Sequence, residues 1–78
     1  MRLAQLPRNS SGIVEGLEAG ADDPIARRLG ELGFVPGETV RVVAVAPLGG
    51  DPLVVEIGDT RFALRRSEAA RVRLQVPA

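Results

Sequence analysis

Apolar residues recur at helical spacing between residues 23 and 33. They form one stripe with a 3.6-residue period, made by Ile25, Leu29 and Leu32. Asp23 suits a helix N-cap, and Pro24 suits the first helical position because its missing N–H would have no intrahelical partner there. Gly33 can take the left-handed backbone conformation that ends a helix. The pattern therefore predicts a short helix over residues 24–32 with one buried face.

The rest of the chain follows strand spacing, in which alternate side chains point to opposite faces. We expect five strands, over residues 12–17, 39–46, 53–57, 61–64 and 72–76. Gly12 and Gly16 indicate bending of the first strand. The second strand becomes apolar on both faces, as a long strand does when it curves through a barrel. A single helical turn is expected over residues 65–70.

Two connections between the predicted strands have clear turn signals. Residues 47–52 contain two prolines and two glycines, which break the strand pattern and turn the chain. Gly58 and Asp59 lie between two strands and suit a two-residue hairpin, with glycine at the first central position of a type II′ turn. These signals predict antiparallel neighbours on both sides of the strand over residues 53–57.

The chain has 78 residues, which indicates a single domain over residues 1–78. An open five-stranded sheet of this size would expose two hydrogen-bonding edges and one apolar face, so closing the strands is favoured. We therefore expect a mainly β protein, a small SH3-like barrel of five strands. The helix lies between the first and second strands and is expected to cap one open end of the barrel.

Composition excludes several kinds of chemistry. The chain contains no Cys, His or Lys. These absences remove thiol nucleophiles, imidazole bases, zinc-finger spacings and the lysine of a phosphate-binding loop. No apolar run approaches the length needed to cross a bilayer, and the N-terminus lacks the apolar core of a signal peptide. We expect a cytoplasmic protein with no membrane insertion, no enzyme activity, no catalytic residue and no cofactor.

Charge is balanced overall but unevenly placed, with ten Arg against ten acidic residues. From Arg61 onward there are five Arg and one acid, a local balance of +4, whereas residues 15–59 hold nine acids and three Arg, a balance of −6. The arginines either form a basic patch for phosphates or an acidic partner, or they solvate the outer face of a small barrel. We favour solvation.

Carboxylates are the strong metal ligands that remain. Glu18, Asp22 and Asp23 form the densest group and could make a site for a hard cation. Asp23 is better explained as the helix cap. We expect no metal site.

Four motifs follow one another along the chain: RRLGELGFVPGETVRVV, APLGGDPLVVEI, GDTRFALRRSEA and a closing VRL. In this order they resemble the FeoA family of small cytoplasmic proteins in bacterial ferrous iron uptake. The likeness extends from about residue 12 to residue 76. It implies an SH3-like barrel and association with the large membrane permease FeoB, and it implies no catalytic residue.

The favoured hypothesis is a protein-binding module that docks on a FeoB-type permease at the cytoplasmic side of the inner membrane. We expect its contact surface on the outer face of the helix together with the loop that follows the second strand, because arginine and exposed apolar loop tips are enriched at interfaces. The residues predicted to make this surface are Arg27, Arg28, Glu31, Pro47, Leu48 and Gly49. Weak self-association through a strand edge stays open.

The alternative hypothesis is a regulatory module like the C-terminal SH3-like domain of diphtheria-toxin-repressor-type metalloregulators, or a small barrel that binds nucleic acid through its arginines. The repressor's DNA-reading and dimerisation regions do not fit in 78 residues. With no Trp or Tyr and only two Phe, the chain lacks the aromatic groove for proline-rich peptides and the stacking platforms for single strands. We expect no nucleic acid partner.

Overall fold

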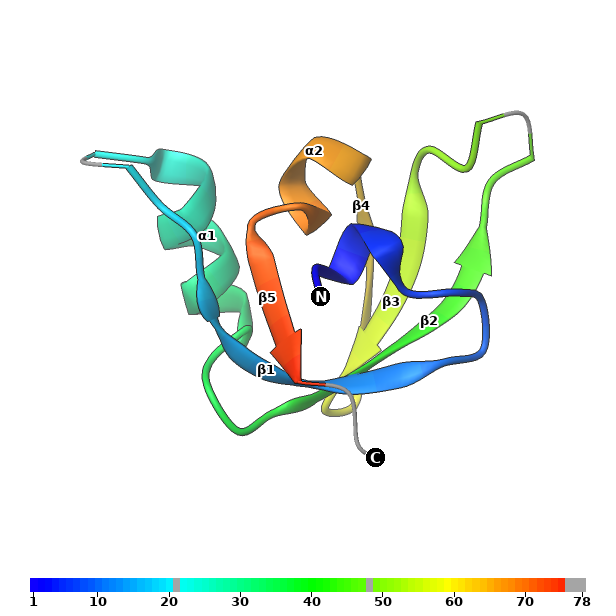
Figure 1. Cartoon of the computed structure of the whole chain (residues 1–78), viewed down its shortest axis with the longest axis horizontal. Helices are drawn as coiled ribbons and strands as arrows, with labels where there is room; N and C mark the ends of the chain where they lie inside the picture. Colours follow the sequence, from blue (N-terminus) through cyan, green and yellow to red (C-terminus); the bar gives the residue numbers. More distant parts are fainter. Residues whose placement is uncertain (21, 48, 76–78) are drawn as a thin grey trace.

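A computed structural model describes residues 1–20, 22–47 and 49–75 of the chain. Five strands form one antiparallel sheet in the order β4-β3-β2-β1-β5 (Figure 1). The elements are η1 (Leu3–Gln5), β1 (Ser11–Leu17), α1 (Pro24–Leu32), β2 (Thr39–Val45), β3 (Leu53–Ile57), β4 (Thr60–Leu64), α2 (Arg66–Ala69) and β5 (Val72–Gln75). The mainly β class, the position of the helix between the first two strands and the helical turn before the last strand are confirmed.

Helix α1 begins and ends where its local signals predict. The Asp23 carboxylate accepts hydrogen bonds from the backbone N–H groups of Ile25 and Ala26, at 3.0 and 3.3 Å. Gly33 has a φ of +113°, and the N–H of Phe34 donates to the carbonyl of Leu29 at 3.1 Å. These bonds satisfy groups that a helix end leaves without partners.

The strands coil as the glycines in β1 indicate. The β1–β5 register shifts between Val14 and Gly16, and the β2–β3 register shifts between Val42 and Ala44. Such bulges bend a strand and increase its twist. A Cβ atom at Gly12 would lie 3.2 Å from a side-chain carbon of Leu74, so the two strands approach closely there. Strand β2 ends at Val45, one residue earlier than predicted, and the predicted end of β5 at residue 76 lies outside the described residues.

The hairpin between β3 and β4 has the predicted two-residue turn. Ile57 pairs with Thr60, and Gly58 has a φ of +58°. A positive φ at the first central residue is what a type II′ turn requires. The turn sets a regular register along the whole β3–β4 pair.

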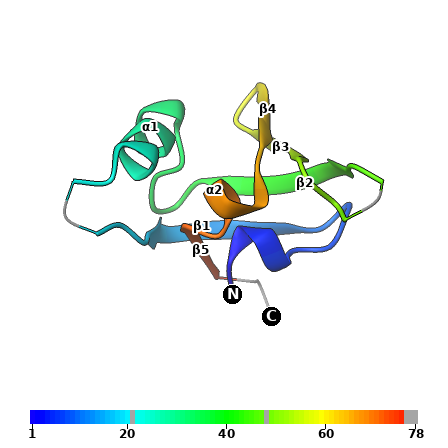
Figure 2. The same cartoon turned by 90° about the horizontal axis from the view of Figure 1, so that it is seen from above.

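The sheet is not closed by hydrogen bonds, which corrects the expectation of complete closure. Within the described residues, β4 and β5 are the two ends of the sheet and do not pair with each other. The N-terminal turn η1 and helix α2 lie between these ends and cover the concave side (Figures 1 and 2). The sequence pattern missed η1, although it buries Leu3 completely.

The core lies on the concave side of the sheet and is apolar throughout the described residues. Its members are Leu3, Leu6, Val14, Leu29, Phe34, Val40, Val42, Leu53, Val55, Ile57, Leu64, Ala69, Val72 and Leu74. Ile25 and Leu32 of α1 are half-buried against this cluster. The rings of Phe34 and Phe62 lie 6.0 Å apart, which joins the helix end to β4. Helix α1 therefore packs its apolar stripe on the core, as predicted.

Candidate functional site

The outer face of α1 carries the three predicted contact residues of the helix. Arg27, Arg28 and Glu31 are all exposed. Arg27 pairs with Asp22 at 3.4 Å, and Arg28 pairs with Glu68 of α2 at the same distance. The Arg27–Asp22 pair is exposed on both sides, and such pairs contribute at most about 1 kcal/mol to stability. In the Arg28–Glu68 pair the guanidinium is exposed, whereas the Glu68 side chain is only 14% exposed.

The loop between β2 and β3 is the other part of the predicted surface. Pro47 and Gly49 are exposed, and Leu48 lies outside the described residues. The loop and α1 project from opposite ends of the molecule, whose longest dimension is 33 Å (Figure 1). The structure therefore does not bring the predicted helix and loop residues together, and they form two separate patches.

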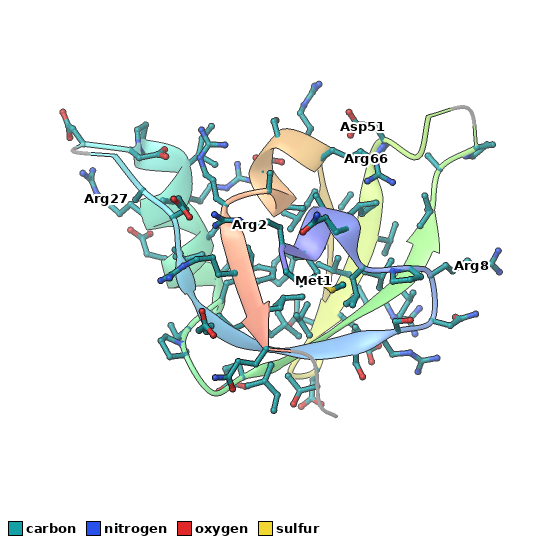
Figure 3. All side chains as sticks on the ribbon, viewed as in Figure 1. Met1, Arg2, Arg8, Arg27, Asp51 and Arg66 are labelled. Atoms are coloured by element: carbon teal, nitrogen blue, oxygen red, sulfur yellow. The ribbon has the colours of Figure 1, made fainter. Side chains whose placement is uncertain are left out.

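Arg66 holds the β2–β3 loop in place, a role that the sequence pattern did not indicate. Its Nη1 donates to the carbonyl of Ala4 at 2.6 Å, and its Nε donates to the carbonyl of Gly50 at 2.9 Å. Its backbone N–H donates to the Asp51 carboxylate at 3.0 Å, and Figure 3 shows the two residues side by side. One arginine thus links α2, η1 and the end of the loop next to β3, at Gly50 and Asp51.

A groove of about 450 Å³ lies between α1 and strand β4. Arg28 lines it from α1 and Ala63 lines it from β4. Arg65 and Glu68 of the α2 region also contribute, as do two residues of the β2–β3 loop. The groove is therefore adjacent to the outer face of α1, and Arg28 belongs to both.

The C-terminal arginines do not form one continuous basic patch. Arg61 pairs with Glu56 at 3.0 Å, and Arg73 lies 3.8 Å from Glu15. Arg66 bonds backbone carbonyls, as described above. The acidic first part of the chain thus neutralises much of the basic last part, which supports the interpretation of the arginines as solvating residues.

The three carboxylates weighed as a cation site each have a different arginine partner. Glu18 pairs with Arg2, and Asp22 pairs with Arg27. The Asp23 carboxylate accepts from Nε of Arg71 at 2.8 Å. Across residues 1–20, 22–47 and 49–75 no group of three acidic side chains is placed to hold a metal ion.

Arg71 and Asp23 join the start of α1 to the segment before β5. The hydrogen bond from Arg71 is the main reason that the pKa of the Asp23 carboxyl lies below its ordinary value of 3.8. Burial opposes this shift, and the backbone N–H groups at the helix start add to it. In the same way the Arg2 guanidinium lowers the pKa of Glu18.

The Asp23→Asn variant should show a pH-dependent loss of stability. Asparagine can still cap the helix but carries no charge for Arg71. Because the folded pKa lies below that of the unfolded chain, the carboxylate stabilises the fold fully above about pH 4, and this contribution is lost as the pH falls through the folded value. Urea unfolding should therefore show a deficit of the variant at neutral pH that shrinks in acid. Asp59→Asn, in the exposed β3–β4 turn, is the control, and a deficit that stays constant with pH contradicts the assignment.

None of the helices in the described ranges has the length and apolar character needed to span a bilayer.

Comparison with known proteins identifies the family. The FeoA domain model matches residues 1–76. A crystal structure of Stenotrophomonas maltophilia FeoA in complex with zinc, described as a prokaryotic SH3 domain protein, is 56% identical, covers 96% of this chain and 89% of its own, and gives a TM-score of 0.88. The prediction of an SH3-like fold is confirmed. A manganese-dependent transcriptional repressor is 18% identical, covers 99% of this chain and 41% of its own, and gives a TM-score of 0.82, a likeness of fold alone.

A curated relative contains both an iron transport protein A and a FeoB transporter in one chain. It is the Fe(2+) transport protein A/Fe(2+) transporter FeoB fusion protein of Porphyromonas gingivalis, 34% identical over 76 residues. The match includes 97% of this chain but only 9% of the fusion protein's length. The family model and this relative agree, and the chain belongs to the FeoA family of ferrous iron transport proteins.

Proposed function

We propose that this chain is a non-catalytic accessory protein of ferrous iron uptake, which docks on a FeoB-type membrane permease and modulates its transport cycle. The observation that carries the proposal is the fusion protein, in which a segment 34% identical to this chain is covalently joined to a FeoB transporter. Covalent linkage holds two modules at a high effective concentration, which favours pairs of modules that act together. Separate chains would meet at the cytoplasmic side of the inner membrane.

The architecture suits a binding role. The described interior is filled by apolar side chains, and the charged side chains lie on the outside, where another protein can reach them. Arg66 holds the β2–β3 loop at Gly50, and α1 is tied to the segment before β5 by the bond between Arg71 and Asp23. Preformed surfaces lose little conformational freedom on binding. We place the main contact on the exposed α1 face and treat the Pro47–Gly49 loop as a second, separate patch.

Charge reversal on α1 tests the proposal. The variant Arg27→Glu/Arg28→Glu should bind a FeoB-type permease in lipid nanodiscs at least about tenfold more weakly than the wild type, because complementary charges become like charges. The matched control is Arg8→Glu/Arg41→Glu, which makes the same charge change at two other exposed arginines. Surface-immobilised permease and the soluble variants give the dissociation constants.

The possible outcomes test the identity of the partner and the location of the contact surface separately. If the wild-type chain forms no complex with the permease, docking on that class of protein is wrong. If both double variants bind the permease as tightly as the wild type does, the permease remains the proposed partner, and the assignment of the contact surface to α1 is wrong. Equal weakening by both variants indicates attraction by overall charge and also removes the assignment to α1.

A further inference from the structure

The two end strands of the sheet differ in how their outer edges are covered. At β5, the N–H of Leu74 donates to the carbonyl of Met1 at 2.7 Å, and Arg2 forms a β-bridge with Arg73. The N-terminal residues therefore occupy the outer edge of β5. At β4, no described residue outside β3 pairs with the strand. Strand β4 thus presents the uncovered edge of the described sheet.

The register of the hairpin shows which backbone groups of β4 point outward. The pair next to the two-residue turn, Ile57 and Thr60, exchanges both hydrogen bonds, and bonded pairs then alternate with unbonded pairs along the strands. Phe62 is therefore bonded to β3, whereas the N–H and C=O groups of Arg61 and Ala63 point away from it. The strand has no bulge against β3 and contains no proline. Bulges, prolines and covering segments are three of the means of blocking an edge, and β4 has none of these three in the described structure. Its protection is the charge of Arg61, which opposes an identical strand but not an acidic one.

The uncovered edge faces the groove between β4 and α1. Ala63 of β4 and Arg28 of α1 both line this groove, together with residues of the β2–β3 loop and the α2 region. Ala63 is exposed and its small side chain leaves the backbone accessible. The groove volume of about 450 Å³ leaves room for a few residues of an extended segment. An extended peptide entering here would lie beside β4 with α1 along its other flank.

Charge around the groove favours an acidic occupant. Both oxygens of Glu68 are already used, Oε1 by the backbone N–H of Arg65 and Oε2 by Arg28. Asp51 accepts from the backbone N–H of Arg66. The guanidinium of Arg65 is exposed and has no ion-pair partner among the described residues. One cation at the mouth of the groove is therefore available to a carboxylate.

From these observations we propose that β4 binds an extended acidic segment of a partner protein by β-strand addition in the groove beside α1. Main-chain bonds to Arg61 and Ala63 supply affinity, and Arg65 selects an acidic side chain. The inference rests on the proposed function for the identity of that partner, the FeoB-type permease. A second copy of this chain is disfavoured as the occupant, because residues 60–66 carry three arginines and no acid and so repel an identical strand.

Hydrogen exchange in the isolated protein tests the edge first. NMR gives the exchange rate of each amide hydrogen. The amide hydrogens of Arg61 and Ala63 should exchange at least about tenfold faster than those of Phe62 and Leu64, which bond to β3. Slow exchange at Arg61 and Ala63 that becomes faster on dilution would show that a second copy occupies the edge. Slow exchange at every dilution would show that the edge is already covered. Either result overturns the proposal.

A synthetic peptide tests the groove independently of the permease. An acetylated, amidated peptide of alternating valine and glutamate should slow exchange at Arg61 and Ala63, and the same peptide with lysine in place of glutamate should not. Arg65→Glu should abolish the effect of the glutamate peptide. Arg8→Glu, at an exposed arginine of the turn before β1 (Figure 3), should leave it intact. Equal effects of both peptides, or no effect of either, contradict the proposal.

Binding measurements with the permease then show whether the permease is the partner that occupies the β4 edge. Binding should be reduced at least about tenfold by Ala63→Pro, which removes an outward N–H, and should be unaffected by Ala63→Ser. Arg65→Glu gives the same information without a backbone change, should the proline variant fail to fold. If the permease binds the variants as tightly as the wild type, and does not slow amide exchange at Arg61 and Ala63, the proposed docking stands and the assignment of the contact to β4 is wrong. If the permease does not bind while the glutamate peptide does, the edge stands and the proposed function is wrong.

Discussion

Replacing Leu29 by alanine should lower the free energy of unfolding by about 2 to 5 kcal/mol, the largest loss that we expect from a single truncation in α1. Leu29 is 0% exposed and belongs to the core cluster. Its backbone carbonyl also accepts the hydrogen bond from Phe34 that ends the helix. Removal of the side chain leaves a cavity where α1 meets the barrel, and the helix cannot fill it without losing its caps.

The control for this prediction is Leu32→Ala on the same helix. Leu32 is only half-buried at the edge of the core, so its truncation should cost clearly less than that of Leu29. Urea unfolding followed by circular dichroism gives both free energies. Equal, small losses for the two variants would mean that α1 does not contribute its apolar stripe to the core.

Replacing Arg66 by alanine should cost about 1.5 to 3 kcal/mol of unfolding free energy, a large effect for a residue outside the core. The substitution leaves the carbonyls of Ala4 and Gly50 without the donors that now reach them at 2.6 and 2.9 Å. Gly50 is buried, with a φ of +66°, and a Cβ atom there would lie 2.5 Å from the Arg66 guanidinium. The loop backbone and the guanidinium therefore fit tightly.

Two further variants separate this role from simple loss of charge. Arg66→Lys keeps the charge but not the planar set of donors, so its stability should fall between those of the wild type and Arg66→Ala. Arg61→Ala removes an exposed arginine that pairs with Glu56 and should cost at most about 1 kcal/mol. Thermal and urea unfolding provide the comparison. An Arg66→Ala variant as stable as Arg61→Ala would show that the bonds to the carbonyls contribute nothing.

The candidate surface was predictable from sequence only in pieces. The exposure of Arg27, Arg28 and Glu31 follows from their positions opposite the apolar stripe of α1. The prediction that they share a surface with the β2–β3 loop had no such basis, and the structure places the two at opposite ends of the molecule. A residue pattern specifies which face of a helix or strand is exposed to solvent. It does not specify which exposed faces lie next to one another in the folded protein.

The sequence by itself determined the features that depend on close neighbours along the chain. Capping by Asp23, the positive φ of Gly33 and Gly58 and the alternation within each strand act over a few residues, and each predicted element was found close to its predicted bounds. Only the tertiary structure decided which strand edge is covered, where Arg66 reaches and where η1 packs. The bond from Arg66 to Ala4 spans 62 positions of the chain, and η1 is too short to show a period. Such contacts depend on the path of the whole backbone, which no local pattern encodes.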